Sequence, residues 1–236
     1  TDEPLTASSL QYIQGDLAIA AATGSFGAGA LTTVTGAMTI NQTGDLLMPT
    51  LNSVAGGITI DTSNVTITSV DFSGLTEGAA RTGTDALVLP NATSVKISGV
   101  LPTTVTCVSA TTFISNSTAA QTASTIQVDG STDFSLASSS FSGDVSITAV
   151  GGVNLAGVTS AKGLSIVSTG AVNLGLTSIS SATSISASGT VDLSSLASVG
   201  SSTVVTATDV TLSALATTGA VTITLNGPTS VLAPLL

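Results

Sequence analysis

Apolar and polar residues alternate in short stretches along this chain, and similar stretches return at a fixed distance. Stepping by nineteen residues reaches the same kind of apolar residue in three series. The first is Ile147, Ile166, Ile185, Val204 and Ile223, the second Leu155, Leu174, Leu193 and Leu212, and the third Val153, Val172, Val191 and Val210. Self-similarity at a period of about twenty residues is typical of a solenoid.

Each repeat contains two stretches with the period of a β-strand. In Val145-Ser146-Ile147 two apolar residues flank a polar one, and Val153-Asn154-Leu155 repeats this pattern beyond the glycines at 151 and 152. Alternation with a period of two indicates a strand with one buried face. Such short strands cannot bury their apolar face alone, so stacked repeats bury a continuous column. We therefore expect an all-β, single-domain β-solenoid with a repeat of 19–20 residues.

The first half of the chain repeats at a slightly longer step. The pattern Leu31-x-x-Val34-x-Gly36-x-Met38-x-Ile40 returns twenty residues later, from Leu51. Met48–Val54 also aligns with Leu89–Val95 at a distance of 41 residues, which we interpret as two coils.

Three segments depart from the repeat. Residues 71–86 hold four charges and lose the periodicity, which predicts a loop insertion that protrudes from the solenoid and could make contacts. Residues 1–16 are expected to form an irregular lead-in or cap. The solenoid would then cover residues 17–228, and residues 229–236 would form an apolar C-terminal tail.

The composition narrows the class of protein. Of 236 residues, 42% are hydrophobic, which argues against intrinsic disorder. No apolar run approaches the roughly 18 residues of a membrane-spanning helix. Three basic residues against thirteen acidic ones argue against nucleic-acid binding, which needs clustered Lys and Arg. The chain begins Thr1-Asp2-Glu3 without a methionine, which we interpret as a processed, secreted form.

Few residues could carry chemistry. The chain has no histidine, so a catalytic triad or a zinc site is not expected. Asp129 and Asp133 are the closest acidic pair, and we interpret them as part of a surface turn that could give a weak Ca²⁺ contact. Cys107 lies in an apolar stretch and is expected to be a buried hydrophobic residue, with an intermolecular disulfide as the alternative. We expect no catalytic, cofactor-binding or metal site and no enzymatic activity.

Two polar series share the nineteen-residue step. Asn154, Asn173, Asp192 and Thr211 predict a ladder that faces outward or caps a turn. Ser146, Ser165, Ser184, Thr203 and Thr222 predict an outward rank of hydroxyl groups. Paired columns with Thr at nearly every turn would indicate ice binding. Because Ser supplies three of these five positions, ice binding is the weaker interpretation.

Four N-glycosylation sequons stand in the first half of the chain. Their asparagines are Asn41, Asn64, Asn91 and Asn116, spaced at about one per coil. In a source that glycosylates, they would place sugar on one side of the N-terminal half.

A repeated phrase resembles a known group of surface proteins. Met48-Pro49-Thr50-Leu51-Asn52-Ser53-Val54-Ala55-Gly56-Gly57-Ile58-Thr59-Ile60 is similar to the Leu-Pro-x-Leu-x-Ser-Val-x-Gly-x-Leu-x-Ile pattern of receptor L-domain and leucine-rich-repeat-like proteins. The resemblance covers most of the chain as a pattern and implies a right-handed solenoid in a secreted or surface-held protein. The chain lacks the Asn or Cys ladder of leucine-rich repeats and the disulfide caps of receptor domains, so a plain β-helix stays the alternative architecture.

These observations predict an extracellular or cell-surface structural protein that assembles with itself into a fibre, sheath or coat, with adhesion as an added role. Surface glycans and other envelope proteins are further candidate partners. Leu232, Leu235 and Leu236 are candidate assembly residues, because a monomer would leave this tail in water. Removing residues 229–236 is therefore expected to abolish assembly. The alternative function is a secreted β-helix that binds or cleaves carbohydrate.

Overall fold

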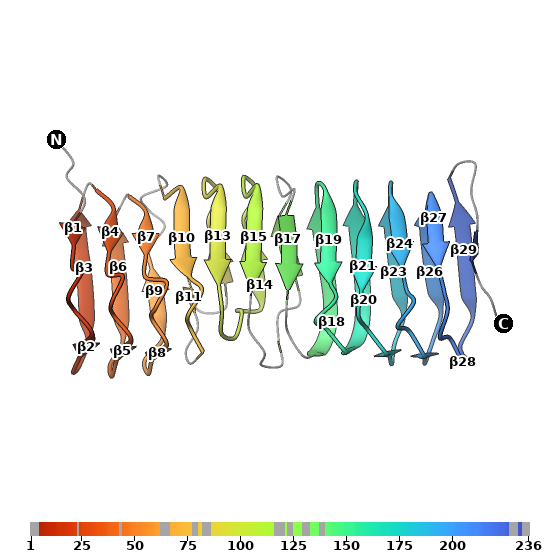
Figure 1. Cartoon of the computed structure of the whole chain (residues 1–236), viewed down its shortest axis with the longest axis horizontal. Coiled ribbons are helices and arrows are strands. Elements are labelled where there is room, and N and C mark those ends of the chain that lie inside the picture. Colours follow the sequence, from red (N-terminus) through yellow and green to blue (C-terminus); the bar gives the residue numbers. More distant parts are fainter. Residues whose placement is uncertain are drawn as a thin grey trace.

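The computed structural model is a single stack of β-strands (Figure 1). It describes residues 5–22, 24–42, 44–61, 67–76, 80–81, 86–115, 121, 125–128, 133–136, 140–226 and 231–232. Every regular element within these residues is a strand, and none is a helix that could cross a membrane. Successive turns of the chain pair in parallel along one axis. The predicted all-β solenoid is confirmed.

The longest sheet runs through the whole stack and has twelve strands. In spatial order they are β1 (Leu5–Thr6), β4 (Phe26–Gly27), β7 (Leu46–Leu47), β10 (Ser69–Phe72), β13 (Ser94–Ile97), β15 (Thr112–Ser115), β17 (Asp133–Leu136), β19 (Gly152–Leu155), β21 (Val172–Leu174), β24 (Thr190–Asp192), β27 (Asp209–Thr211) and β30 (Val231–Leu232). Their order follows the order of the chain, as the sequence repeat requires.

The remaining strands form three more sheets. The three-stranded sheet contains β2 (Tyr12–Ile13), β5 (Thr33–Val34) and β8 (Ser53–Val54). The four-stranded sheet contains β3 (Leu17–Ala22), β6 (Met38–Gln42), β9 (Ile58–Ile60) and β11 (Ala80–Arg81). The eleven-stranded sheet contains β12 (Ala86–Val88), β14 (Thr104–Thr106), β16 (Thr125–Val128), β18 (Ser140–Ala149), β20 (Ser160–Ser168), β22 (Ser178–Ile179), β23 (Thr183–Ala187), β25 (Ser198–Val199), β26 (Thr203–Ala207), β28 (Thr217–Thr218) and β29 (Val221–Leu225).

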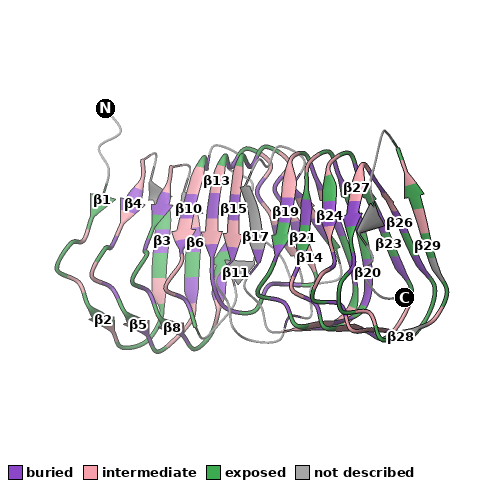
Figure 2. Ribbon diagram, turned by 45° about the vertical axis from the view of Figure 1, so that its right-hand side comes forward, coloured by how far each residue is buried: buried purple, intermediate pink, exposed green. Residues whose placement is uncertain are grey.

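The core consists of apolar columns inside the stack, because alternate residues of each strand point inward. One column contains valines that pair in register from β19 to β27, namely Val153, Val172, Val191 and Val210. A second column contains isoleucines that pair from β18 to β23, namely Ile147, Ile166 and Ile185. Figure 2 shows buried and exposed residues alternating along the strands. The nineteen-residue register is confirmed for these turns.

One member of the predicted isoleucine series is wrong. Val205, not Val204, pairs with Ile185 and then with Ile223. Val205 is fully buried, whereas Val204 is 39% exposed. The outward rank therefore contains Val204, and Thr203 lies inside the stack. A shift of one residue moves a side chain to the opposite face of a sheet, which explains the exchange.

The one-residue shift arises at a corner. After β21 the corner Leu174-Gly175-Leu176 has a single residue between two buried leucines, whereas Leu193–Leu196 after β24 has two. A Cβ at Gly175 would overlap the carbonyl oxygen of Ala156 in the preceding turn, so only glycine permits the shorter corner. The longer corner delays the next strand by one residue.

The predicted loop insertion at 71–86 begins in the core instead. Phe72 ends β10, which pairs with β13, and both Phe72 and Leu75 are fully buried. Strand β11 pairs with β9, while residues 77–79 and 82–85 lie outside the described residues. Val70 pairs with Leu46 and with Val95, so this turn spans 25 residues and the turn before it 24, whereas the next turn, from Val95 to Phe113, spans 18. Residues 71–76 thus belong to the solenoid, and a protruding loop in the rest of 71–86 stays a prediction.

Both predicted end segments contribute strands to the solenoid. Strands β1 and β2 fall within the predicted lead-in, residues 1–16, and pair with β4 and β5. Strand β30 falls within the predicted tail, residues 229–236, and pairs Leu232 with Thr211 of β27. Leu235 and Leu236 lie outside the described residues. Residues 5–16 therefore belong to the solenoid, in the same turn as β3.

The phrase that carries the family resemblance forms a corner turn. The N–H of Leu51 donates to the carbonyl of Met48 at 3.2 Å, and the N–H of Ala92 donates to the carbonyl of Leu89 at 3.3 Å. The first turn follows β7 of the twelve-stranded sheet, but the second follows β12 of the eleven-stranded sheet. The alignment at 41 residues therefore matches turns at two different corners, and its interpretation as two coils is wrong.

Candidate functional site

The outer face of the eleven-stranded sheet carries two parallel columns of uncharged residues. One column contains Thr104, Thr125, Ser146, Ser165, Ser184, Val204 and Thr222. The other, two residues further along each strand, contains Thr106, Gln127, Thr148, Val167, Ser186, Thr206 and Thr224. Paired columns are what ice binding would need, but Val167, Val204 and Gln127 interrupt the hydroxyl groups.

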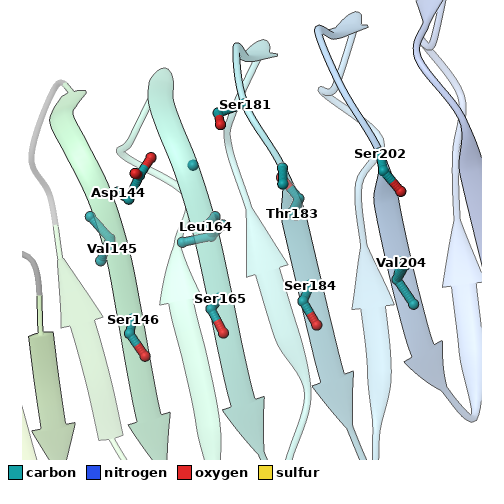
Figure 3. A pocket seen from close by; sticks show the side chains of 12 residues that line it. Asp144, Val145, Ser146, Leu164, Ser165, Ser181, Thr183, Ser184, Ser202 and Val204 are labelled. Atoms are coloured by element: carbon teal, nitrogen blue, oxygen red, sulfur yellow. The ribbon is translucent and has the colours of Figure 1, made fainter.

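An open groove of about 480 Å³ lies along this face, across β18, β20, β23 and β26 (Figure 3). Ser146, Ser165 and Ser184 line it in three successive turns, and Ser181 and Ser202 line it at the corners. Hydroxyl groups both donate and accept hydrogen bonds, so the groove can hold an uncharged polar chain that crosses several turns.

An ion pair lies beside the groove on β18 and β20. The Nζ atom of Lys162 is 3.6 Å from Oδ2 of Asp144, and the two side chains are 56% and 66% exposed. Solvent screens such a pair, so it stabilises the fold by at most about 1 kcal/mol. Gly163 leaves room for the carboxylate, since a Cβ there would lie 2.6 Å from Oδ1 of Asp144. The pair adds no net charge to the groove.

Two threonine hydroxyls, one on Thr183 in the wall of the groove and one on its neighbour Thr203, are buried without a hydrogen-bond partner in the described structure. Thr183 and Thr203 are 3% and 1% exposed and pair with each other in register. Neither Oγ1 atom has a partner. Their neighbours in the same inward column are Leu164 and Val221, which offer no polar group. An unsatisfied buried hydroxyl costs free energy of folding.

Replacing Thr203 with Val should stabilise the protein. The two side chains have the same shape, and valine removes a hydroxyl that has lost its water, so we expect the free energy of unfolding to rise by about 1 kcal/mol. Denaturant unfolding followed by circular dichroism measures the change. Thr222→Val on the exposed face is the control and should change stability by less than about 0.5 kcal/mol. A destabilised Thr203→Val variant would show that the hydroxyl does have a partner, such as a buried water.

The predicted Asn and Asp ladder caps corner turns. Oδ1 of Asn154 accepts a hydrogen bond from the N–H of Ala156 at 3.0 Å, and Oδ1 of Asp192 accepts one from the N–H of Ser194 at 2.9 Å. Asn173 lies between them in register. Asn154 and Asp192 thus have a structural role that needs no ligand, and the prediction of a series that faces outward or caps a turn is confirmed for these two residues.

Two of the four predicted glycosylation asparagines lie in the described residues. Asn91 is exposed in the turn after β12, and Thr93 of the same sequon is also exposed. Asn41 is half-buried within β6 and pairs with Ala20 of β3. Asn64 and Asn116 lie outside the described residues. Asn91 is thus the better placed of the two to carry a glycan.

Cys107 is a buried hydrophobic residue, as predicted. It is fully buried, and desolvation raises the pKa of its thiol to about 12, against a smaller lowering by a backbone hydrogen bond with Leu89. The thiol therefore stays protonated at neutral pH and is unreactive. While the fold is intact, it cannot reach a second chain to form a disulfide.

The predicted acidic pair is only partly described. Asp129 lies outside the described residues, and Asp133 begins β17, where it pairs with Thr112 and Gly152. Within the described part of the chain, no three His, Cys, Asp or Glu residues lie close enough together to hold a metal ion. The Ca²⁺ contact stays a prediction.

Sequence reasoning missed a buried amide that holds one corner. Gln121 is fully buried; its Oε1 accepts a hydrogen bond from the N–H of Leu101 at 2.7 Å, and its Nε2 donates to the carbonyl of Gly99 at 3.2 Å. Its own backbone N–H donates to the carbonyl of Ser140 in the following turn. One side chain thus takes the place of strand pairing between turns.

The strands at the two ends of the stack have one neighbour each among the described strands. These are β1, β2 and β3 at the first turn and β28, β29 and β30 at the last. The N–H of Leu17 in β3 donates to Ala37 in the second turn at 2.9 Å. Because backbone groups alternate in direction along a strand, Ala18 and Ala20 direct theirs away from the stack. Both alanine side chains are exposed.

Comparison with known proteins finds no matching family model, no matching curated protein and no matching solved structure. The resemblance to receptor L-domain and leucine-rich-repeat-like proteins therefore stays a prediction.

Proposed function

We propose that this chain is a structural protein that assembles with itself into an extracellular or cell-surface fibre, sheath or coat. The observation that supports the proposal is that β3 at one end of the described stack and β29 at the other each pair with a single neighbour among the described strands. Unpaired N–H and C=O groups are a template for pairing with another chain. A head-to-tail contact that does not close produces a filament.

The composition of the edge strands supports the same function. Proteins that avoid association place Lys, Pro or an inward charge on an edge strand. Neither Leu17–Ala22 at the first turn nor Val221–Leu225 at the last contains a charged residue or a proline. Leu5 and Tyr12, on the other strands of the first turn, are 57% and 56% exposed. Neither a charge nor a proline in β3 or β29 opposes pairing with a second copy.

Carbohydrate binding is the second candidate function, and the groove on the eleven-stranded sheet favours it. The groove presents hydroxyl groups in successive turns and has no net charge, as a neutral glycan chain would require. None of its lining residues is aromatic, so stacking on sugar rings would contribute nothing there.

The substitution Ala18→Pro tests the role of the open edge. Proline removes the N–H that points away from the stack but no hydrogen bond to the second turn, so the monomer should stay folded. Without that donor we expect the concentration needed for assembly to rise about tenfold, which corresponds to roughly 1.4 kcal/mol per contact. Sedimentation velocity and electron microscopy measure the assembled fraction.

The matched control is Ala18→Val, which keeps the N–H at the same position. It should assemble like the original chain. Equal assembly of the proline and valine variants would remove β3 from the contact. A chain that stays monomeric at high concentration would contradict the proposed function itself.

A further inference from the structure

We infer that two copies join head to tail, with β29 of one copy pairing in parallel with β3 of the next in a single defined register. The inference rests on the proposed self-assembly and specifies its contact. It is drawn from the layout of the two end turns, the direction of their free backbone groups and the apolar columns that end there.

The first turn has the same layout as the turns near the other end. Eight residues separate Leu5 of β1 from Ile13 of β2, and four separate Ile13 from Leu17 of β3. Likewise, eight residues separate Val191 of β24 from Val199 of β25, and four separate Val199 from Thr203 of β26. The last turn has spacings of eight and three between the matching residues Val210, Thr218 and Val221. The β24–β26 turn already stacks on it, so a turn with the spacings of the first turn can lie on it as well.

The backbone groups fix the register. Inside the stack the N–H of Thr183 donates to Ser202 at 2.9 Å, and that of Thr203 donates to Ala220 at 2.8 Å. Inward-facing residues of this sheet therefore direct their N–H groups toward the following turn. By the same rule Val221 and Ile223 of β29 direct theirs away from β26, toward the side on which no described strand pairs with β29, whereas Ala18 and Ala20 of β3 face the opposite way.

Continuing the pattern of backbone hydrogen bonds by one turn assigns the residue pairs across the contact between the two copies, which we call the joint. The N–H of Val221 donates to the carbonyl of Asp16 in the second copy, so Val221 pairs with Leu17 and Ile223 pairs with Ile19. Thr222 then lies beside Ala18 on the outer face. The apolar columns continue, since Ile223 follows Val205 in one copy and Ile19 precedes Ile40 in the next.

The joint also buries side chains that a single copy leaves half-exposed. Ile223 and Leu225 at the last turn, and Ile13 and Leu17 at the first, pack against the core but are only partly buried. A second copy stacked in this register covers both sets. Burial of apolar area is the main favourable contribution to such contacts.

The twelve-stranded sheet imposes one further condition. Strand β30 already lies on β27, where it pairs Val231 with Val210. With β2 and β3 of a second copy stacked on β28 and β29, its β1 would need that same position. Only one of the two strands can occupy it, so β30 blocks the joint until it moves aside or β1 does.

Engineered cysteines test the register. Because the native Cys107 is buried, the engineered thiols are the ones that react. In the double variant Ala18→Cys, Thr222→Cys the two Cα atoms would lie about 4.8 Å apart on neighbouring strands. That distance is within the reach of a disulfide. Oxidised glutathione accepts the two electrons and protons as the bond forms. We expect a ladder of covalent multimers on a non-reducing gel.

The matched control, Ala20→Cys with Thr222→Cys, moves one thiol two residues along β3. Its Cα atoms would then be roughly 8 Å apart by the same strand spacing. Disulfides do not bridge more than about 7 Å. A strong ladder from the first variant and a weak one from the control supports the register, and equal ladders overturn it. If electron microscopy shows filaments but the first variant gives no ladder, the register is overturned and the proposed function still stands. If both the filaments and the ladder are absent, the register and the proposed function are both overturned.

Removing residues 229–236 from the Ala18→Cys, Thr222→Cys variant tests the role of β30. Because the deletion clears the position on β27, we expect the ladder to form faster, opposite to the expectation from the sequence alone. A circular-dichroism melt confirms that the shortened chain is folded. Loss of the ladder in a folded chain would overturn the assignment of β30 as a block and indicate that the tail joins the copies.

Discussion

Replacing Ile185 with Asp is expected to unfold the protein or destabilise it by about 4 kcal/mol or more. Ile185 is 1% exposed, and its column neighbours in the adjacent turns are Ile166 and Val205. A carboxylate at this position would have no hydrogen-bond partner and no counter-charge. Denaturant unfolding followed by circular dichroism, or the loss of soluble protein on expression, measures the effect.

Ser184→Asp is the matched control, because Ser184 precedes Ile185 but points to the outer face. It should change stability by no more than about 0.5 kcal/mol. Burial would raise the pKa of the new carboxyl in Ile185→Asp above the unfolded value of about 3.9. The folded state would then bind a proton that the unfolded state releases. The stability lost in Ile185→Asp relative to the original chain should therefore shrink as the pH falls through the folded pKa. Equal stability of the two variants at neutral pH would contradict the inward column.

Replacing Gln121 with Ala should cost about 3 kcal/mol of the free energy of unfolding. The substitution leaves the N–H of Leu101 and the carbonyl of Gly99 without their amide partner in a buried corner, and it opens a cavity. Thermal and denaturant unfolding measure the loss. Gln14→Ala, at an exposed position of the first turn, is the control and should be nearly neutral.

The conservative variant Gln121→Glu separates the two hydrogen bonds. A glutamate keeps the oxygen that accepts the hydrogen bond from the N–H of Leu101 but loses the donor to the carbonyl of Gly99. The Gln121→Glu variant should therefore be no more stable than the original chain. If Gln121→Ala were as stable as Gln14→Ala, the corner would be held by backbone pairing alone.

The alternation of residues in this chain predicts its core well wherever each turn has corners of equal length. Ile147, Ile166 and Ile185 pair as the nineteen-residue step requires. The step fails at Val204 because the longer corner at Leu193–Leu196 delays the next strand by one residue, which exchanges its inward and outward positions. Since Val204 and Val205 are both apolar, the sequence offers no sign of the slip.

Contacts between distant residues account for what sequence reasoning missed. The amide of Gln121 bonds to groups in the preceding turn, and no local pattern marks the residue. The charges at Asp71 and Glu77 suggested a loop, but Phe72 and Leu75 between them are fully buried. Strands β1 and β2 in the predicted lead-in were missed because a two-residue strand gives too short a pattern to recognise in the sequence.

The close stacking of glycines at the corners has a consequence for the length of the molecule. A Cβ at Gly189 would lie 2.8 Å from the backbone of Gly170, and one at Gly170 would lie 2.5 Å from Gly151, so each corner fits directly on the one before. Duplicating one whole repeat would therefore add about 4.8 Å to the axis and leave both ends unchanged. The length of the solenoid can therefore change in steps of one turn while the contacts between neighbouring turns stay the same.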